Sequence, residues 1–118
     1  MTIEVLKSKL HRGTVTDANL DYEGSVSIDK DLYEKAGFYH HEKVDILNLT
    51  NGSRLTTYII DGGPGEICVN GAAAHLCKKG DMVIIVSYAS MTPEEAKKFR
   101  AKIILLDKDN KAALMTDD

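Results

Sequence analysis

The sequence has only two cysteines and no apolar run long enough to cross a membrane. A membrane-spanning helix needs about 18 or more consecutive apolar residues, and the apolar stretches are far shorter than that. The N-terminal segment also lacks the apolar stretch and the cleavage site of a signal peptide. We therefore expect a cytoplasmic protein without a membrane partner, in which Cys68 and Cys77 are free thiols.

Positive charge is not in excess, because 15 Lys and Arg residues face 18 Asp and Glu residues and leave a net charge of -3. Nonspecific affinity for nucleic acids comes mainly from neutralised phosphates, so nucleic acid is not an expected partner. Cys68, His75 and Cys77, together with the pair His40-His41, do not have the spacing of a zinc site. We expect no metal.

The composition is that of an ordinary globular domain, with 43% apolar and 28% charged residues in a chain of 118. Short apolar stretches alternate with turn signals, which predicts a mainly β fold with a few short helices. We expect one barrel domain over residues 1–118, with frayed residues at the C-terminal end. The expected strands cover residues 3–6, 9–15, 26–28, 44–49, 54–60, 67–69, 82–88 and 103–106.

Two helix starts are visible in the sequence. Asp29 is a suitable N-cap for a helix over residues 30–36, and Gly37 then occupies the left-handed position after its end. Thr92 and Glu95, with a proline between them, form the pattern of a capping box for a second helix.

The firmest local prediction is a β-hairpin formed by residues 44–49 and 54–60. Asn51-Gly52 lies between them, and this dipeptide favours a two-residue type I′ turn. Further along the chain, residues 70–74 are expected to pass from a strand into a short helix that ends at Gly80.

The segment Tyr22-Glu23-Gly24-Ser25 bears most directly on function. A Gly-Ser pair alone predicts only a turn, so its companions decide its meaning. Alternation along residues 9–15 places Lys9 and His11 on one face of a strand. In chain order the full set is Lys9 and His11, Tyr22-Glu23-Gly24-Ser25, Asn51-Gly52 followed by Arg54-Leu55-Thr56-Thr57-Tyr58, and Asn70-Gly71-Ala72-Ala73-Ala74.

This set, in this order and spacing, resembles the aspartate 1-decarboxylase family of pyruvoyl-dependent enzymes over nearly the whole chain. The resemblance implies a double-psi β-barrel, a homotetramer, and autocatalytic cleavage between Gly24 and Ser25 into a β chain (1–24) and an α chain (25–118). Ser25 would become a pyruvoyl group, the covalent cofactor that forms a Schiff base with the substrate. The implied reaction converts L-aspartate to β-alanine and CO2 in pantothenate biosynthesis. The need for an accessory maturation protein, and the preference for aspartate over glutamate, stay open.

The resemblance also implies a role for each residue of the set. Tyr58 is the proton donor, and Thr57 stabilises the oxyanion and contacts the substrate. Gly24 is expected to remove a Cβ that would hinder attack and to allow a strained backbone. Arg54 can grip a carboxylate through two parallel hydrogen bonds. The expected substrate-binding residues are Lys9, His11, Tyr22, Arg54, Asn70, Gly71, Ala72 and Ala73, of which residues 71–73 would offer free N–H groups at a helix start.

Strict alternation along residues 54–60 creates a tension, because it places Tyr58 on one face of the strand and Thr57 on the other. Either a bulge or a strong twist brings Thr57 round, or Ser25 lies at the edge of the strand, where both faces are within reach.

Each of these residues also has an ordinary interpretation. Thr57 fits a β-branched strand position and Tyr58 a core aromatic, while Lys9 and Arg54 fit solvated surface charges, as we expect of Lys7. The alternative function is a non-enzymatic barrel module, a regulator or an adaptor, in which the Gly-Ser pair is only a turn.

Overall fold

The protein is described over residues 1–118 by a computed structural model. The strands are β1 (Ile3–Thr14), β2 (Asp17–Asn19), β3 (Ser25–Asp29), β4 (Lys43–Asn48), β5 (Arg54–Gly62), β6 (Ile67–Asn70), β7 (Met82–Met91), β8 (Lys102–Leu106) and β9 (Ala112–Asp117). The helices are α1 (Lys30–Lys35), the 3-10 helix η1 (Gly71–His75) and α2 (Pro93–Lys98). All strands join one sheet in the order β2-β6-β3-β5-β4-β7-β1-β8-β9.

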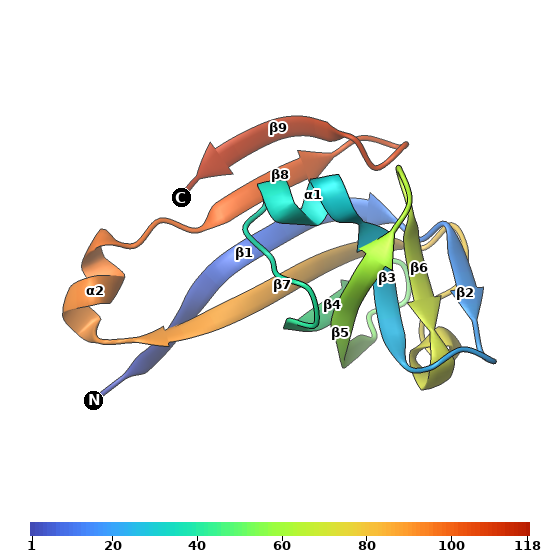
Figure 1. The fold of residues 1–118 in the computed structure, drawn as a ribbon, viewed down its shortest axis with the longest axis horizontal. Helices are drawn as coiled ribbons and strands as arrows, with labels where there is room; N and C mark the ends of the chain where they lie inside the picture. Colours follow the sequence, from blue (N-terminus) through green and yellow to red (C-terminus); the bar gives the residue numbers. More distant parts are fainter.

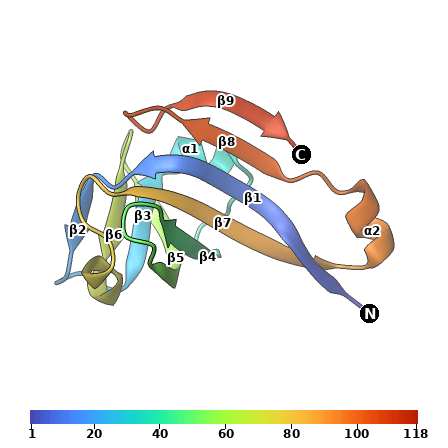
Figure 2. The ribbon, with the colours of Figure 1, turned by 180° about the vertical axis from the view of Figure 1, so that it is seen from behind.

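The strands are arranged in two directions (Figure 1). Strands β1, β7, β8 and β9 run along the length of the molecule, whereas β2, β3, β5 and β6 cross it at one end. The rear view shows β1 and β7 side by side, as their antiparallel pairing requires, with η1 and α2 at opposite ends (Figure 2). The predicted mainly β barrel with a few short helices is confirmed.

The core is built mainly from β-branched and leucine side chains that alternate along the strands. Such residues pack well on a pleated surface, and every second residue along β3, β4 and β6 points into the core. The core residues with at most 1% exposure include Leu10, Val26, Ile28, Val44, Ile46, Ile59, Ile67, Val69, Val83, Ile85 and Ile104. Strand β7 lies between β4 and β1 in the middle of the sheet, as its apolar sequence predicts.

The N-terminal strand is longer than predicted. The strands expected over residues 3–6 and 9–15 are one strand, β1, which ends at Thr14 and pairs antiparallel with β7 and parallel with β8. The register with β7 shifts between Leu6 and Ser8 and again between Leu10 and Gly13. These irregularities interrupt the apolar pattern without ending the strand, since a bulge adds a residue to one strand only.

The last strand was missed by the sequence analysis. Residues near the C-terminal end, predicted to fray, form β9 and pair antiparallel with β8. Every residue of β9 is exposed. An edge strand without a buried face carries no apolar alternation, so its sequence gives no signal for a strand.

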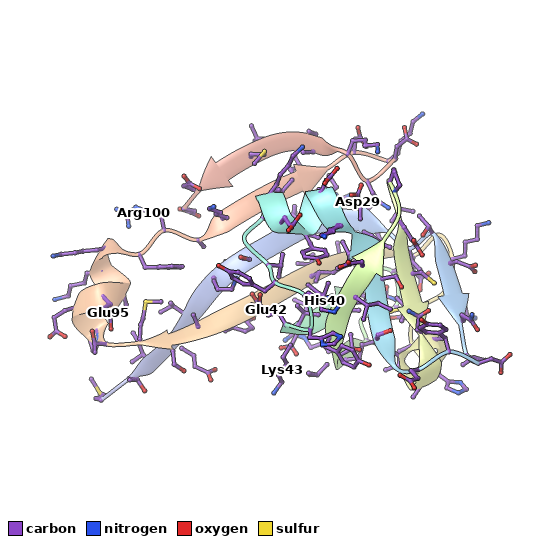
Figure 3. The ribbon with its side chains drawn as sticks, viewed as in Figure 1. Asp29, His40, Glu42, Lys43, Glu95 and Arg100 are labelled. Carbon is purple, nitrogen blue, oxygen red and sulfur yellow. The ribbon has the colours of Figure 1, made fainter.

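Both predicted helix starts are confirmed, and Figure 3 shows Asp29 and Glu95 at well-separated places in the molecule. The Asp29 carboxylate accepts a hydrogen bond from the Leu32 N–H at 3.3 Å, and Gly37 has φ 81°. Helix α1 ends at Lys35, one residue earlier than expected. At α2 the Thr92 hydroxyl and the Glu95 carboxylate complete the capping box.

The predicted hairpin is confirmed, because β4 and β5 pair antiparallel. The predicted type I′ turn is wrong, since Gly52 has a positive φ of 79° but Asn51 does not. Residues 49–53 form a longer loop that the Asn48 side chain stabilises. Its Oδ1 accepts hydrogen bonds from the N–H groups of Thr50 at 2.9 Å and Asn51 at 3.3 Å, a local bond pattern that competes with regular pairing.

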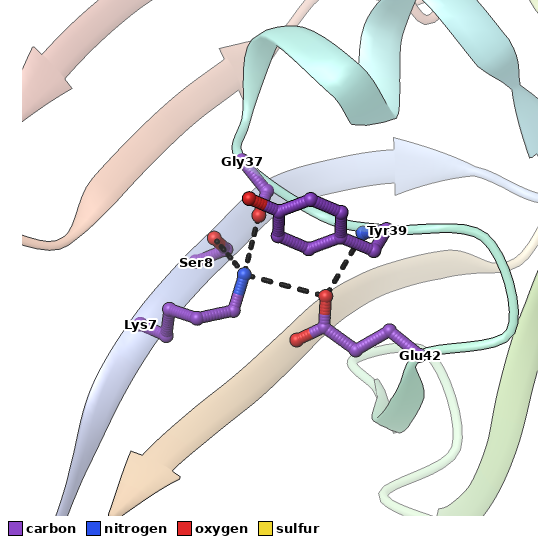
Figure 4. Close-up of polar contacts among 5 residues, drawn as sticks. All are labelled: Lys7, Ser8, Gly37, Tyr39 and Glu42. Atoms are coloured by element: carbon purple, nitrogen blue, oxygen red, sulfur yellow. Dashed lines mark hydrogen bonds and ion pairs between the residues drawn. The ribbon is translucent and has the colours of Figure 1, made fainter. Parts of the chain in front are cut away.

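Lys7 is not the solvated surface charge that we predicted. Its ammonium group lies 3.3 Å from the Glu42 carboxylate and also donates to Ser8 Oγ and to the Gly37 carbonyl oxygen (Figure 4). The Tyr39 N–H donates to the same Glu42 carboxylate at 2.9 Å. The Lys7–Glu42 ion pair joins the segment after α1 to strand β1, a contact that no local pattern predicts.

No helix in the structure has the length and apolar character needed to span a membrane.

Candidate active site

Ser25 is the first residue of β3 and is 1% exposed. Strand β3 pairs antiparallel with β6, which places Ser25 directly opposite Asn70. The Asn70 side-chain amide donates a hydrogen bond to Ser25 Oγ at 3.1 Å, and the Ser25 hydroxyl donates to the Glu23 carbonyl oxygen at 3.1 Å. The Ser25 hydroxyl is therefore held on both sides, immediately after Gly24.

Gly71 makes the closest backbone approach to this segment. Its φ of +67° lies in the left-handed region, and a Cβ added there would come within 2.6 Å of the Gly24 nitrogen and 2.7 Å of the Gly24 Cα. The Tyr22 carbonyl oxygen would lie 2.9 Å away. Only glycine fits at position 71, so the start of η1 packs directly against the backbone before Ser25.

Gly24 does not have the strained backbone that we expected. Its φ is not in the left-handed region, and an added Cβ would meet nothing within 4 Å outside its chain neighbours. The fold around residue 24 therefore accommodates a side chain. Any requirement for glycine at this position comes from the peptide bond to Ser25 itself.

Strand order brings Thr57 and Tyr58 to the same place. Strand β5 runs parallel to β3, and their pairing begins with Val26 opposite Ile59, so Ser25 and Tyr58 each lie one residue before the first pair. The pairing of β4 with β5 is regular, without a bulge. Thr57 and Tyr58 therefore stay on opposite faces of β5, and no bulge brings Thr57 round to the face of Tyr58.

The sequence analysis missed the aromatic surroundings of Tyr58. The His41 ring meets the Tyr58 ring edge-on, with centroids 5.5 Å apart, and stacks on His40 at 3.9 Å. His40 Nδ1 lies 3.3 Å from the Asp61 carboxylate, which also accepts a hydrogen bond from the Tyr33 hydroxyl at 2.5 Å. Burial, followed by this hydrogen bond to Asp61, raises the pKa of Tyr33 to about 12.

Lys9 and His11 lie on β1, and strands β5, β4 and β7 separate β1 from β3 in the sheet. The structure does not bring them to Ser25 through strand pairing. His11 Nδ1 is buried without a hydrogen-bond partner. Burial, and then the charges of Lys9 and Arg12, lower the pKa of His11 below its ordinary value of 6.5.

Arg54 is exposed and begins β5, four residues before Tyr58. Four residues of strand span roughly 13 Å, so Arg54 does not reach Ser25 along its own strand. It lines a cavity of about 120 Å³ with Asp45, Leu47, Leu55 and Thr56. None of the five surface cavities of the chain is lined by Ser25, Tyr58 or Asn70.

The remaining predicted residues cluster around η1. Tyr22 is 54% exposed, Ala72 is exposed and Ala73 is half-buried against the core. The strand-to-helix transition at Asn70 is confirmed, but the helix ends at His75 rather than at Gly80. No group of three or more His, Cys, Asp or Glu side chains is placed to hold a metal ion.

Fold and site together define a small, mainly β protein in which a buried serine follows a glycine at the start of a strand. A family model described as aspartate decarboxylase matches residues 1–113. The chain is 54% identical to the aspartate 1-decarboxylase of Thermoanaerobacter pseudethanolicus, over 94% of this chain and 97% of that protein. It is 56% identical to the aspartate 1-decarboxylase of Campylobacter hominis, over 95% and 98% of the two chains. The chain belongs to the aspartate decarboxylase family, a family of carboxy-lyases.

Proposed function

We propose that this chain cleaves its own backbone between Gly24 and Ser25 and that the product decarboxylates L-aspartate to β-alanine and CO2, a step of pantothenate biosynthesis. Cleavage gives a β chain of residues 1–24 and an α chain of residues 25–118, which together form one barrel domain. The observation that carries the proposal is the buried Ser25 hydroxyl, held between Asn70 Nδ2 and the Glu23 carbonyl oxygen directly after Gly24.

Cleavage proceeds in three steps: transfer of the acyl group to Ser25, elimination, and hydrolysis. The Ser25 Oγ attacks the Gly24 carbonyl carbon, a C–O bond replaces the C–N bond, and the hydroxyl proton passes to the departing nitrogen. Loss of the Ser25 Cα proton then breaks the Cβ–Oγ bond, and its electron pair leaves with the Gly24 carboxylate. Addition of water and release of ammonia leave a ketone at residue 25.

The surroundings of Ser25 fit such a group. Residues 20–24 are all exposed, so the new carboxyl terminus can leave without displacing core side chains. The pyruvoyl group supplies an electron-withdrawing carbonyl that accepts the electrons released with CO2. The protein has to bind the substrate beside residue 25, exclude water and deliver a proton.

Thr57 and Tyr58 take the two chemical roles at this position. Thr57 lies two residues before Ile59, the partner of Val26 on β3, and its hydroxyl stabilises the oxyanion formed during cleavage. Tyr58 directly precedes Ile59, the partner of Val26, and is half-buried, and its phenol donates the proton that replaces the lost carboxylate. The edge-on contact with His41 fixes the Tyr58 ring.

Lys9 and Arg54, the two cations that bind the carboxylates of the substrate, come from a neighbouring copy in a homotetramer. Three strands separate Lys9 from Ser25 in one subunit, and Arg54 lies at the far end of β5. Both residues nevertheless share one face of the sheet. Lys9 lies opposite Val86, Val86 opposite Asp45, and Asp45 opposite Thr56, so these four side chains point to the same face. Arg54 lies two residues before Thr56 on β5 and therefore points to that face too. A second subunit that packs on this face can supply both cations to the site of the first.

The segment at the start of η1 completes the substrate site. Gly71 and the small side chains of Ala72 and Ala73 allow a carboxylate to approach backbone N–H groups. Tyr22, which is exposed beside the cleavage position, and His11 line the pocket in the assembled enzyme.

The test combines mass spectrometry with an activity assay. The purified chain is expected to yield fragments 1–24 and 25–118, a larger fragment blocked to Edman degradation, and a hydrazine adduct on that fragment. Processed protein should form β-alanine from aspartate faster than it decarboxylates glutamate. A chain that stays intact after prolonged heating and does not react with hydrazine would overturn the proposal and favour a non-enzymatic module. Adding an accessory protein is unnecessary if cleavage proceeds in the purified chain.

Two variants separate cleavage from turnover. Ser25→Ala should remain intact and inactive. Tyr58→Phe should still be cleaved but lose on the order of a hundredfold in turnover, the usual contribution of a general acid. Tyr39→Phe is the matched control, because Tyr39 lies in the segment after α1 and is 73% exposed. Equal turnover of the Tyr58 and Tyr39 variants would exclude Tyr58 as the proton donor.

A further inference from the structure

Four polar side chains are buried together on one face of strands β3 and β6. Ser25 faces Asn70 and Ser27 faces Cys68 in the antiparallel register. Their exposed fractions are 1% for Ser25, 3% for Asn70, 8% for Ser27 and 9% for Cys68. We refer to these four residues as the polar quartet. The opposite faces of the same strands carry core residues such as Val26 and Val69, so the quartet is a polar layer set against an apolar one.

The side-chain amide of Asn70 is bonded to all three other members of the quartet. Its Nδ2 donates to Ser25 Oγ and to Ser27 Oγ, each at 3.1 Å. Its Oδ1 accepts from the Cys68 thiol at 3.3 Å. An amide has two N–H donors and one carbonyl acceptor, so both donors and the acceptor of Asn70 are used within the quartet.

The bonds from Cys68 and Ser27 favour the orientation in which the NH2 group of Asn70 faces Ser25. The thiol at Oδ1 offers a hydrogen, so the carbonyl end of the amide belongs on the side of Cys68. Burial, followed by the charges of Glu66 and Asp17, raises the pKa of Cys68, so the thiol keeps the hydrogen that it donates. Ser27 Oγ takes the second N–H and holds the NH2 group between the two serines. Because the Ser25 hydroxyl already donates to the Glu23 carbonyl oxygen, its Oγ needs a donor, and this orientation of the Asn70 amide supplies one while bonding both ends of the amide.

We infer that Ser27 and Cys68 are positioning residues for self-cleavage, which act by holding the Asn70 amide with its NH2 group against Ser25 Oγ. The inference rests on the proposed function, because it concerns the reaction at Ser25. It assigns Ser27 and Cys68 a part in that reaction although neither belongs to the motifs that identify the site.

The chemistry of cleavage explains why the orientation matters. When the Cβ–Oγ bond of Ser25 breaks, its electron pair moves to Oγ, which leaves as an oxygen of the Gly24 carboxylate. An N–H donor already pointing at Oγ stabilises the negative charge that develops there. An amide turned the other way would present its carbonyl oxygen to the same atom and oppose that charge.

The experiment measures the rate at which freshly purified intact chain is converted to the 1–24 and 25–118 fragments. Cys68→Ala and Ser27→Ala should each slow conversion about fivefold, the effect of losing one hydrogen bond between neutral groups. Cys68→Ser keeps a donor at the same place and should restore a rate within about twofold of the original. Cys77→Ala is the matched control, because Cys77 is also buried but is bonded to Asn48.

A second measurement separates positioning from a general effect on folding. In an Asn70→Ala background the Cys68→Ala and Ser27→Ala changes should have no further effect on cleavage, because both act through the absent amide. Thermal unfolding of each variant confirms that the chains compared are folded. Full additivity with Asn70→Ala, or a Cys68→Ala rate equal to that of the original chain, would overturn the inference. A wild-type chain that never cleaves would instead refute the proposed function itself.

Discussion

Gly71→Ala is the substitution whose effect the structure defines most sharply. Gly71 begins η1 with φ +67°, and its Cα faces the backbone of Gly24. An alanine Cβ at this position would lie 2.6 Å from the Gly24 nitrogen and 2.9 Å from the Tyr22 carbonyl oxygen. These are backbone atoms, so no side-chain rotation relieves the contact. The segment before Ser25, or the start of η1, has to move.

Two costs add up in this variant. A residue with a Cβ in the left-handed region costs about 1–2 kcal/mol. Displacing packed backbone to accommodate an extra methyl group costs a further 1–3 kcal/mol or so, the typical range for overpacking. Gly71→Ala should therefore lower the free energy of unfolding by roughly 2–5 kcal/mol. It should also slow cleavage, because the displaced segment carries the scissile peptide bond.

Two other glycines provide matched controls. Gly52 has φ +79° but open space around its Cα, so Gly52→Ala incurs the conformational cost without the contact. Gly24→Ala incurs neither cost in the fold. The difference between the Gly71 and Gly52 variants isolates the contact with Gly24, because changes in the unfolded chain are the same for both.

The assay is urea unfolding in a Ser25→Ala background, where every chain stays intact, at one fixed protein concentration because assembly contributes to stability. Cleavage of the same glycine variants is then followed by mass spectrometry with Ser25 present. If Gly71→Ala is no more destabilising than Gly52→Ala, the close approach of η1 to Gly24 is refuted.

Three further predictions concern titration and capping. Burial lowers the pKa of His11 below 6.5, so the unfolded state binds more protons just below that pH, and the free energy of unfolding falls as pH drops through this range. His11→Gln should lessen that fall, measured by urea unfolding at about pH 7.5 and about pH 5, and an unchanged fall would contradict the buried state of the ring. Tyr33→Phe removes the hydrogen bond that chiefly lowers the pKa of Asp61, so NMR titration of the variant should find that pKa closer to 3.8. The difference in unfolding free energy between the original chain and the variant should narrow as pH falls through the pKa of Asp61, because protonation of Asp61 removes the stability that the bond provides. An Asp61 that titrates as before would show that the Tyr33 hydroxyl does not bind it. Thr92→Ala should lower the free energy of unfolding by about 1 kcal/mol because it removes the cap of α2. Thr92→Ser keeps a capping hydroxyl and should retain most of that stability. If both variants lose the same stability in thermal unfolding, the capping box is excluded.

Local structure in this protein could be predicted from the sequence because its interactions join residues close together in the chain. The Asp29 cap and the Thr92–Glu95 capping box each span only three residues. The hairpin was predicted for the same reason. Its turn was not, because the Asn48 side chain bonds the loop backbone in a way that the Asn51-Gly52 signal does not reveal.

The candidate site was only partly visible in the sequence. The order and spacing of its motifs identified the family and located Gly24 and Ser25, as well as Tyr58 and Asn70. The quartet members Ser27 and Cys68 were missed, although each lies two residues from a recognised position and therefore on the same strand face. Period-two alternation next to a known site residue is the signal that would have found them.

The sequence by itself determined the mainly β character, the two helix caps and the set of residues that carries the family resemblance. Only the tertiary structure decided that Ser25 meets Asn70, 45 positions along the chain, that Gly71 packs on Gly24, and that three strands separate Lys9 from Ser25. The physical reason is that strand order and register depend on how the whole apolar surface is buried. A short stretch of sequence encodes its own periodicity, but not the strand against which it will pair.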